Sequence, residues 1–110
     1  MDEAIKKLDD ALSELVAFLN DHDLPNWRDW MAEAQSRLRT APRDGVKKVL
    51  AAYGGMGSFY DLGIGRESDG EGFLRWAPGG EEVDRRLDAL RDLVRELADR
   101  IRVEAGWVFT

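Results

Sequence analysis

The sequence predicts a mainly α-helical protein, a single bundle-like domain of four helices with one short β-hairpin. Apolar residues recur at three- and four-residue spacings in the first fifty and the last thirty residues, the pattern of helices that bury one face. Nine of the eleven glycines lie between Gly54 and Gly80, a stretch too rich in glycine for a helix. With 110 residues, the chain has the length of one domain, residues 1–110.

The first two helices are expected at about residues 3–21 and 24–39. Acidic residues in the first turn of the first helix suit the positive end of the helix dipole. Pro25 suits the first turn of the second helix, and Asp23 is the predicted N-cap. The two apolar stripes are Ile5, Leu8, Leu12, Leu15 and Leu19 in the first helix, and Trp27, Trp30, Met31, Ala34 and Leu38 in the second.

The third and fourth helices are expected at about residues 41–53 and 81–105. Pro42 requires a break from the second helix, and Gly106 is expected to end the last one. Gly45 is expected to weaken the third helix by roughly 1 kcal/mol relative to alanine. We predict that six stripe residues are buried in one core: Leu12, Leu15, Val49, Leu87, Leu90 and Leu97.

The glycine-rich stretch, residues 54–80, is the expected place of the hairpin. Phe59–Ile64 and Phe73–Trp76 have the composition of two short strands. Ser68, Asp69 and Gly70 between them have the chemistry of a turn.

The composition excludes several classes of function. The chain has no cysteine and one histidine, His22, so it lacks the side chains for thiol chemistry or for a Cys- or His-rich metal site. We expect no cofactor, no metal and no catalytic residues. A net charge of −6 disfavours nucleic-acid binding. No apolar run is long enough to cross a membrane, and the first residues are acidic, so we expect a cytoplasmic protein.

Two acidic groupings are weak candidates for a cation site. His22 lies between Asp21 and Asp23, but adjacent side chains on a turn point in different directions, and we interpret them as a solvated helix end. A ridge of acids spaced four apart in the last helix is interpreted in the same way, because arginines accompany it. Its members are Asp84, Asp88 and Asp92.

One motif resembles a known family. The run Tyr53–Leu62, YGGMGSFYDL, resembles a family of small bacterial proteins of unknown function whose hallmark is a GGMGSFND-like motif. Tyr60 stands where the family pattern has asparagine, and Gly63 interrupts an apolar stretch that is usually continuous. The resemblance covers about residues 42–98 and implies a helix end, an extended stretch, a turn and a charged last helix. It implies no activity and no cofactor.

The residues of the motif can also be interpreted without the family resemblance. Gly54, or its neighbour Gly55, is expected to take a positive φ at the end of the third helix. Gly57 permits close packing, and the apolar side chains can fill the core from the loop. The motif residues are Gly54, Gly55, Met56, Gly57, Ser58, Phe59 and Asp61. We interpret them as structural, and the alternative is a small ligand-binding protein or enzyme that uses Ser58 and Asp61.

The favoured function is a protein-binding module. Residues 1–23 carry seven acids against two lysines, whereas residues 24–53 carry six bases against three acids. Complementary charge within the fold, or an acidic surface that is simply solvated, would explain this distribution. A basic partner protein would explain it too, and exposed aromatics often supply the holding energy at an interface. The expected interface residues are Asp9, Asp10, Glu14, Trp76 and Trp107. Within this class, we expect an immunity- or antitoxin-like inhibitor of a basic partner protein.

Overall fold

The computed structural model describes residues 2–54, 59, 66–68, 74–76 and 79–109. It is mainly helical, as predicted. The helices are α1 (Asp2–Asp21), α2 (Pro25–Thr40), α3 (Pro42–Ala51) and α4 (Gly80–Ala105), and two short strands, β1 (Arg66–Ser68) and β2 (Leu74–Trp76), lie between α3 and α4.

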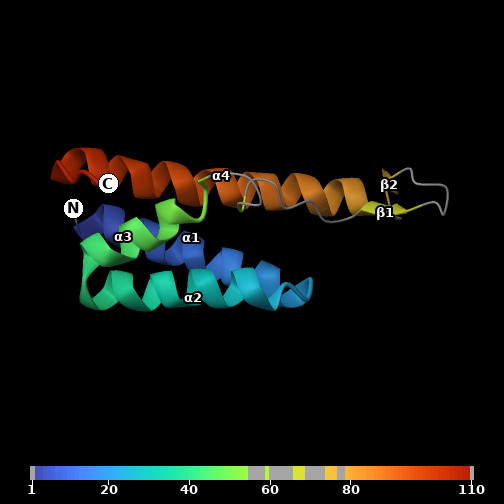
Figure 1. Ribbon diagram of the computed structural model, residues 1–110, viewed down its shortest axis with the longest axis horizontal. Coiled ribbons are helices and arrows are strands. Elements are labelled where there is room, and N and C mark those ends of the chain that lie inside the picture. The colour runs from blue at the N-terminus through green and yellow to red at the C-terminus, as the bar shows by residue number, and fades with distance from the viewer. Residues whose placement is uncertain (1, 55–58, 60–65, 69–73, 77–78, 110) are drawn as a thin grey trace.

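The four helices alternate in direction and form a closed ring of contacts. Each helix packs against two others, α1 on α2, α2 on α3, α3 on α4 and α4 on α1. The long helix α4 runs along one side, with α1 and the short α3 beside it (Figure 1). Of the two helices that α4 packs against, α1 is long and α3 is short.

The core forms from the apolar stripes of all four helices. Of the six predicted core residues, Leu12, Leu15, Val49 and Leu87 are fully buried. The other two, Leu90 and Leu97, are only partly buried and pack against the edge of the core. The fully or nearly fully buried helix residues also include Leu8, Leu19, Met31, Ala34, Leu38, Val46, Val94, Ala98 and Ile101.

One predicted helix end is wrong, and a second is tested only in part. The residue before α2 is Leu24, with φ −116°, and Asp23 instead takes the left-handed conformation at φ 57°. Aspartate tolerates that conformation better than most residues, which allows the chain to turn between two antiparallel helices. After α3, Ala52 is right-handed at φ −66° and Gly54 does not have a positive φ, while Gly55, the alternative residue of that prediction, lies outside the described residues. At the end of α4, Gly106 has φ 72°, and the predicted stop is confirmed.

Gly45 is a packing residue and not simply a weak point of α3. A Cβ atom on Gly45 would lie 2.5 Å from the backbone N and Cα of Leu38, a separation that real side chains do not reach. The absent side chain therefore lets the backbones of α2 and α3 approach closely.

The hairpin is not confirmed where the sequence predicted it. Phe59, expected to start the first strand, donates its backbone N–H to the carbonyl of Ala52 at 2.8 Å, and residues 60–64 lie outside the described part of the chain. The two strands pair antiparallel with Glu67 opposite Arg75, so Ser68 is in a strand and not in the expected turn. Figure 1 places both strands beyond the amino-terminal end of α4.

Candidate functional site

A shallow groove runs between α1 and α4 and has an apolar floor. A hollow of about 300 Å³ lies between the helices. Its floor consists of Ala11 and Leu97, which pack on or against the core, and Leu93, which is 41% exposed. The hollow is lined by Lys7, Asp10, Ala11, Glu14, Leu93 and Leu97.

Asp10 and Glu14 form the acidic rim of this groove. They are four residues apart and therefore lie on the same side of α1, and both are exposed. Within the part of the chain that the structure describes, neither carboxylate has a hydrogen-bond or ion-pair partner. By contrast, Glu96 on α4 pairs with Arg100 at 3.0 Å. The rim thus offers two uncompensated negative charges beside apolar surface.

The groove continues toward the amino terminus of α1. A second hollow, of about 250 Å³, shares Lys7 and Leu97 with the first. The two hollows together extend over residues 3–14 of α1 and residues 93–104 of α4, about 17 Å at the rise of an α-helix. We call this continuous feature the α1/α4 groove. The second hollow is lined by Glu3, Ala4, Lys7, Leu97, Arg100 and Glu104.

Asp9, the third predicted acidic residue, faces α2 and not the groove. Its carboxylate accepts hydrogen bonds from Gln35 Nε2 at 2.7 Å and from Arg39 Nη2 at 3.1 Å. Burial raises the pKa of Asp9, but the hydrogen bonds from Arg39 and Gln35 and the charge of Arg39 outweigh it, so the pKa lies below its ordinary value. Asp9 therefore joins α1 to α2 and leaves the rim to Asp10 and Glu14.

Trp107 is not among the residues that line the acidic part of the groove. Trp107 follows α4, is half-buried against the core, and donates its backbone N–H to the carbonyl of Arg102 at 3.0 Å. Trp76 lies in β2, and its side chain is outside the described part of the structure. The apolar surface beside the rim comes from Leu93, which is not among the core residues predicted for the last helix, namely Leu87, Leu90 and Leu97.

Most of the glycine-rich motif lies outside the described residues, namely Gly55, Met56, Gly57, Ser58 and Asp61. Of the other two members, Gly54 is exposed and Phe59 is fully buried.

The ring of Phe59, one of the motif residues, lies in an aromatic cluster. Its centroid is 4.9 Å from that of Trp27 and 5.7 Å from that of Tyr53. The buried Arg91 of α4 donates from Nη1 to the Phe59 carbonyl at 2.8 Å, and it also pairs with Asp88. These contacts support a structural role for Phe59.

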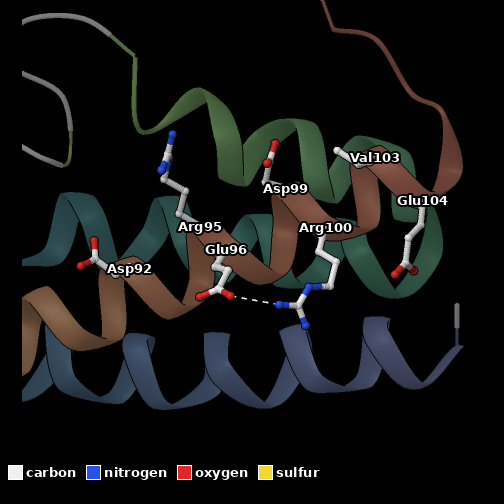
Figure 2. A pocket seen from close by; sticks show the side chains of 7 residues that line it. All are labelled: Asp92, Arg95, Glu96, Asp99, Arg100, Val103 and Glu104. Atoms are coloured by element: carbon white, nitrogen blue, oxygen red, sulfur yellow. Dashed lines mark hydrogen bonds and ion pairs between the residues drawn. The ribbon is translucent and has the colours of Figure 1, made fainter.

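A larger hollow, of about 670 Å³, lies along the outer face of α4 (Figure 2). All seven residues that line it belong to this one helix. Two of its acids are ion-paired along the helix, Glu96 with Arg100 at 3.0 Å and Asp99 with Arg102 at 2.9 Å. Because the lining comes from one helix face and its ion pairs are largely exposed, we interpret this face as solvated surface.

Opposite the groove, a hollow of about 320 Å³ between α2 and α3 is rich in bases. Glu33 pairs with Arg37 at 2.9 Å and with Lys48 at 3.6 Å. The hydrogen bond from Arg37, with the charges of both bases, holds the pKa of Glu33 below its ordinary value. One carboxylate of the fold thus pairs with two of these cations. The hollow is lined by Trp30, Arg37, Asp44, Lys47, Lys48 and Ala51.

The other acidic groupings do not form a cation site. His22 is exposed, and its ring lies 4.3 Å from that of Phe18. Asp88 of the acidic ridge pairs with Arg91. Among the described residues, no group of three or more histidine, cysteine or acidic side chains is placed to hold a metal ion. No helix in the same residues is both long and apolar enough to cross a membrane.

Comparison with known proteins identifies one similarity. Residues 20–73 match the family model of DUF6966, a domain of unknown function. The match covers α2, α3 and the residues of the glycine-rich motif, whereas α4 and all but the last two residues of α1 lie outside it. No curated protein and no solved structure matches the chain. The matched segment is therefore similar to an uncharacterised family, and the α1/α4 groove belongs to the part of the chain outside the match.

Proposed function

We propose that the protein is a protein-binding module that takes a basic partner protein at the α1/α4 groove. The observation that carries the proposal is the pair of exposed, uncompensated carboxylates of Asp10 and Glu14 beside the exposed side chain of Leu93. Charged rims accelerate encounter and select the partner, while apolar contacts supply the holding energy.

The distribution of charge over the bundle supports a basic partner. In α1, six acids stand against two lysines, and in α4 eight acids stand against six arginines. In α2 and α3 together, six bases stand against three acids. The molecule therefore has an acidic side, which contains the groove, and a more basic side formed by α2 and α3. An approaching basic protein is oriented toward the acidic side.

Within this class we propose an immunity- or antitoxin-like inhibitor that acts in the bacterial cytoplasm. The small size and acidity suit an inhibitor that covers a basic active site or nucleic-acid surface. The resemblance of Tyr53–Leu62 to small bacterial proteins supports the bacterial assignment.

The proposal is tested by reversing the charge of the rim. The tagged wild-type chain, Asp10→Lys/Glu14→Lys and the control Asp21→Lys/Asp29→Lys are used to capture proteins from extracts of the source cells. The control makes the same change in net charge at two exposed acids outside the groove. We expect wild type and control to retain the same basic protein and the rim variant to lose it.

The association rate of the captured protein is then measured across a salt series. Salt should slow association with wild type, because it screens exposed charges. A rate that ignores salt, or a rim variant that binds as well as wild type, would contradict the proposal.

A further inference from the structure

We infer that the element bound in the α1/α4 groove is an amphipathic α-helix with lysine or arginine on the flank that meets Asp10 and Glu14. The inference rests on the proposed function and names the kind of segment that the basic partner inserts.

The shape of the groove fits a helix. Its walls are two antiparallel helices, and the surface between two packed helices is where the side-chain ridge of a third helix inserts. A length of about 17 Å accommodates roughly three turns of helix. The described walls of the groove contain no β-strand, so an extended segment finds no strand edge there for backbone hydrogen bonds.

The floor of the groove suits a helix with apolar residues at three- and four-residue spacing. Ala4 and Ala11 on α1 are small, and Leu93 and Leu97 on α4 are large and one turn apart. A helix laid along the groove can therefore approach α1 closely and place its apolar stripe against the two leucines. Leu93 is the expected anchor because it is the most exposed apolar residue of the floor, at 41%.

The charges place the basic residues of the partner at one end of the groove. Lys7, which the two hollows share, pairs with Glu3 at 3.9 Å, and Arg100, at the other end, pairs with Glu96 at 3.0 Å. The end at Asp10 and Glu14 has two negative charges without a described partner, whereas at the other end Glu104 alone lacks one among the described residues. Two bases four residues apart on a helix match the spacing of these two acids.

The inference is tested with a designed helical peptide of about fourteen residues. It carries leucines at three- and four-residue spacing along one face and two lysines, four apart, beside them. Two control peptides have the same composition in scrambled order, or glutamate in place of lysine. Binding to the full-length protein is measured by fluorescence polarisation, and the bound surface is mapped by the NMR shifts of α1 and α4.

We expect the designed peptide to bind at least about tenfold more tightly than either control peptide. Leu93→Asp and Asp10→Asn/Glu14→Gln should each weaken binding by about tenfold, and Asp21→Asn/Asp29→Asn should leave it unchanged. Circular dichroism of each variant checks that the fold is retained, which the exposure of these side chains favours.

Equal binding of the scrambled peptide would overturn the inference, because charge alone would then explain the attraction. The proposed function would survive that result if Asp10→Lys/Glu14→Lys still lost the basic protein in the capture experiment. If the protein alone is a dimer and Leu93→Asp makes it a monomer, the groove is an interface between copies of the chain, and the helical-partner inference falls.

Discussion

Arg91 of α4 donates a hydrogen bond of 2.8 Å to the backbone carbonyl of Phe59, 32 residues earlier in the chain. The arginine is only 6% exposed, and its Cζ lies 5.8 Å from the centre of the Phe59 ring. In return, the hydroxyl of Tyr53 donates to the carbonyl of Arg91 at 2.7 Å. Phe59, a residue of the glycine-rich motif, is thus attached to α4 by one buried cation.

Replacing that cation should destabilise the fold. In Arg91→Met, the buried carbonyl of Phe59 loses its donor, and an unsatisfied buried acceptor costs about 1–3 kcal/mol. The free energy of unfolding is measured with urea. The control is Arg85→Met on the same helix, where an exposed pair with Glu81 is lost and the change should stay within about 0.5 kcal/mol. Equal losses in both variants would mean that the contact with Phe59 contributes nothing.

Alanine in place of Gly45 should lower the stability of the fold, whereas alanine in place of Gly54 should not. Alanine in place of glycine favours a helix by about 1 kcal/mol, but at Gly45 the new Cβ would lie 2.5 Å from backbone atoms of Leu38. We expect Gly45→Ala to lower stability by about 1–3 kcal/mol, because the backbones of α2 and α3 must move apart. Thermal unfolding measures the change.

Gly54→Ala is the matched control for that prediction. The nearest atom to its Cβ would be the Ala51 carbonyl oxygen at 4.0 Å, and its φ is not positive. The melting temperature should therefore be unchanged or slightly raised. A stabilising Gly45→Ala variant would contradict the close approach of the two helices.

The helices could be predicted from the sequence because their apolar stripes are long and regular. Stripe positions such as Leu12 and Leu87 are buried by any packing of these faces against one another. The packing role of Gly45 could not be predicted. It depends on the distance between the backbones of α2 and α3, and the residue pattern of one helix gives no information about that distance. The N-cap predicted at Asp23 was wrong for a similar reason, since the path of the connecting chain depends on the packing of both neighbouring helices.

The acidic part of the candidate site was only partly predictable. Composition identifies α1 as acidic, but Asp9 and Asp10 are adjacent and point toward different helices. Which one is exposed depends on where α2 and α4 pack. Leu93 was not among the core residues predicted for the last helix, and its significance comes from its place beside α1.

Three leucines of α4 should differ in the stability that they contribute. Leu87 is fully buried, Leu90 is partly buried and Leu93 is 41% exposed. We expect Leu87→Ala to cost about 2–5 kcal/mol, Leu90→Ala about 1–2 kcal/mol and Leu93→Ala less than about 0.5 kcal/mol. The losses are compared by urea unfolding of the isolated protein. A large loss for Leu93→Ala would mean that this leucine belongs to the core and is not available to a partner.

The ion pair between Asp9 and Arg39 should make the free energy of unfolding depend on pH in the acidic range. The folded pKa of Asp9 is lowered, so its contribution is fully present above the unfolded value, about pH 4, and is lost as the pH falls through the folded pKa. Asp9→Asn should therefore reduce the free energy of unfolding at pH 7, and the difference from wild type should shrink below about pH 4. Urea unfolding over a pH series measures both.

The control for Asp9 is the same substitution in an Arg39→Met background. Without the guanidinium, the carboxylate loses its nearest cation, 3.1 Å away, and keeps the hydrogen bond from Gln35 at 2.7 Å. The pH-dependent difference that Asp9→Asn causes should then become smaller, and the double-mutant cycle gives the coupling between the two residues. If the acid-dependent difference is as large without Arg39 as with it, the ion pair that joins α1 to α2 is not its source, and the hydrogen bond from Gln35 would have to account for it alone.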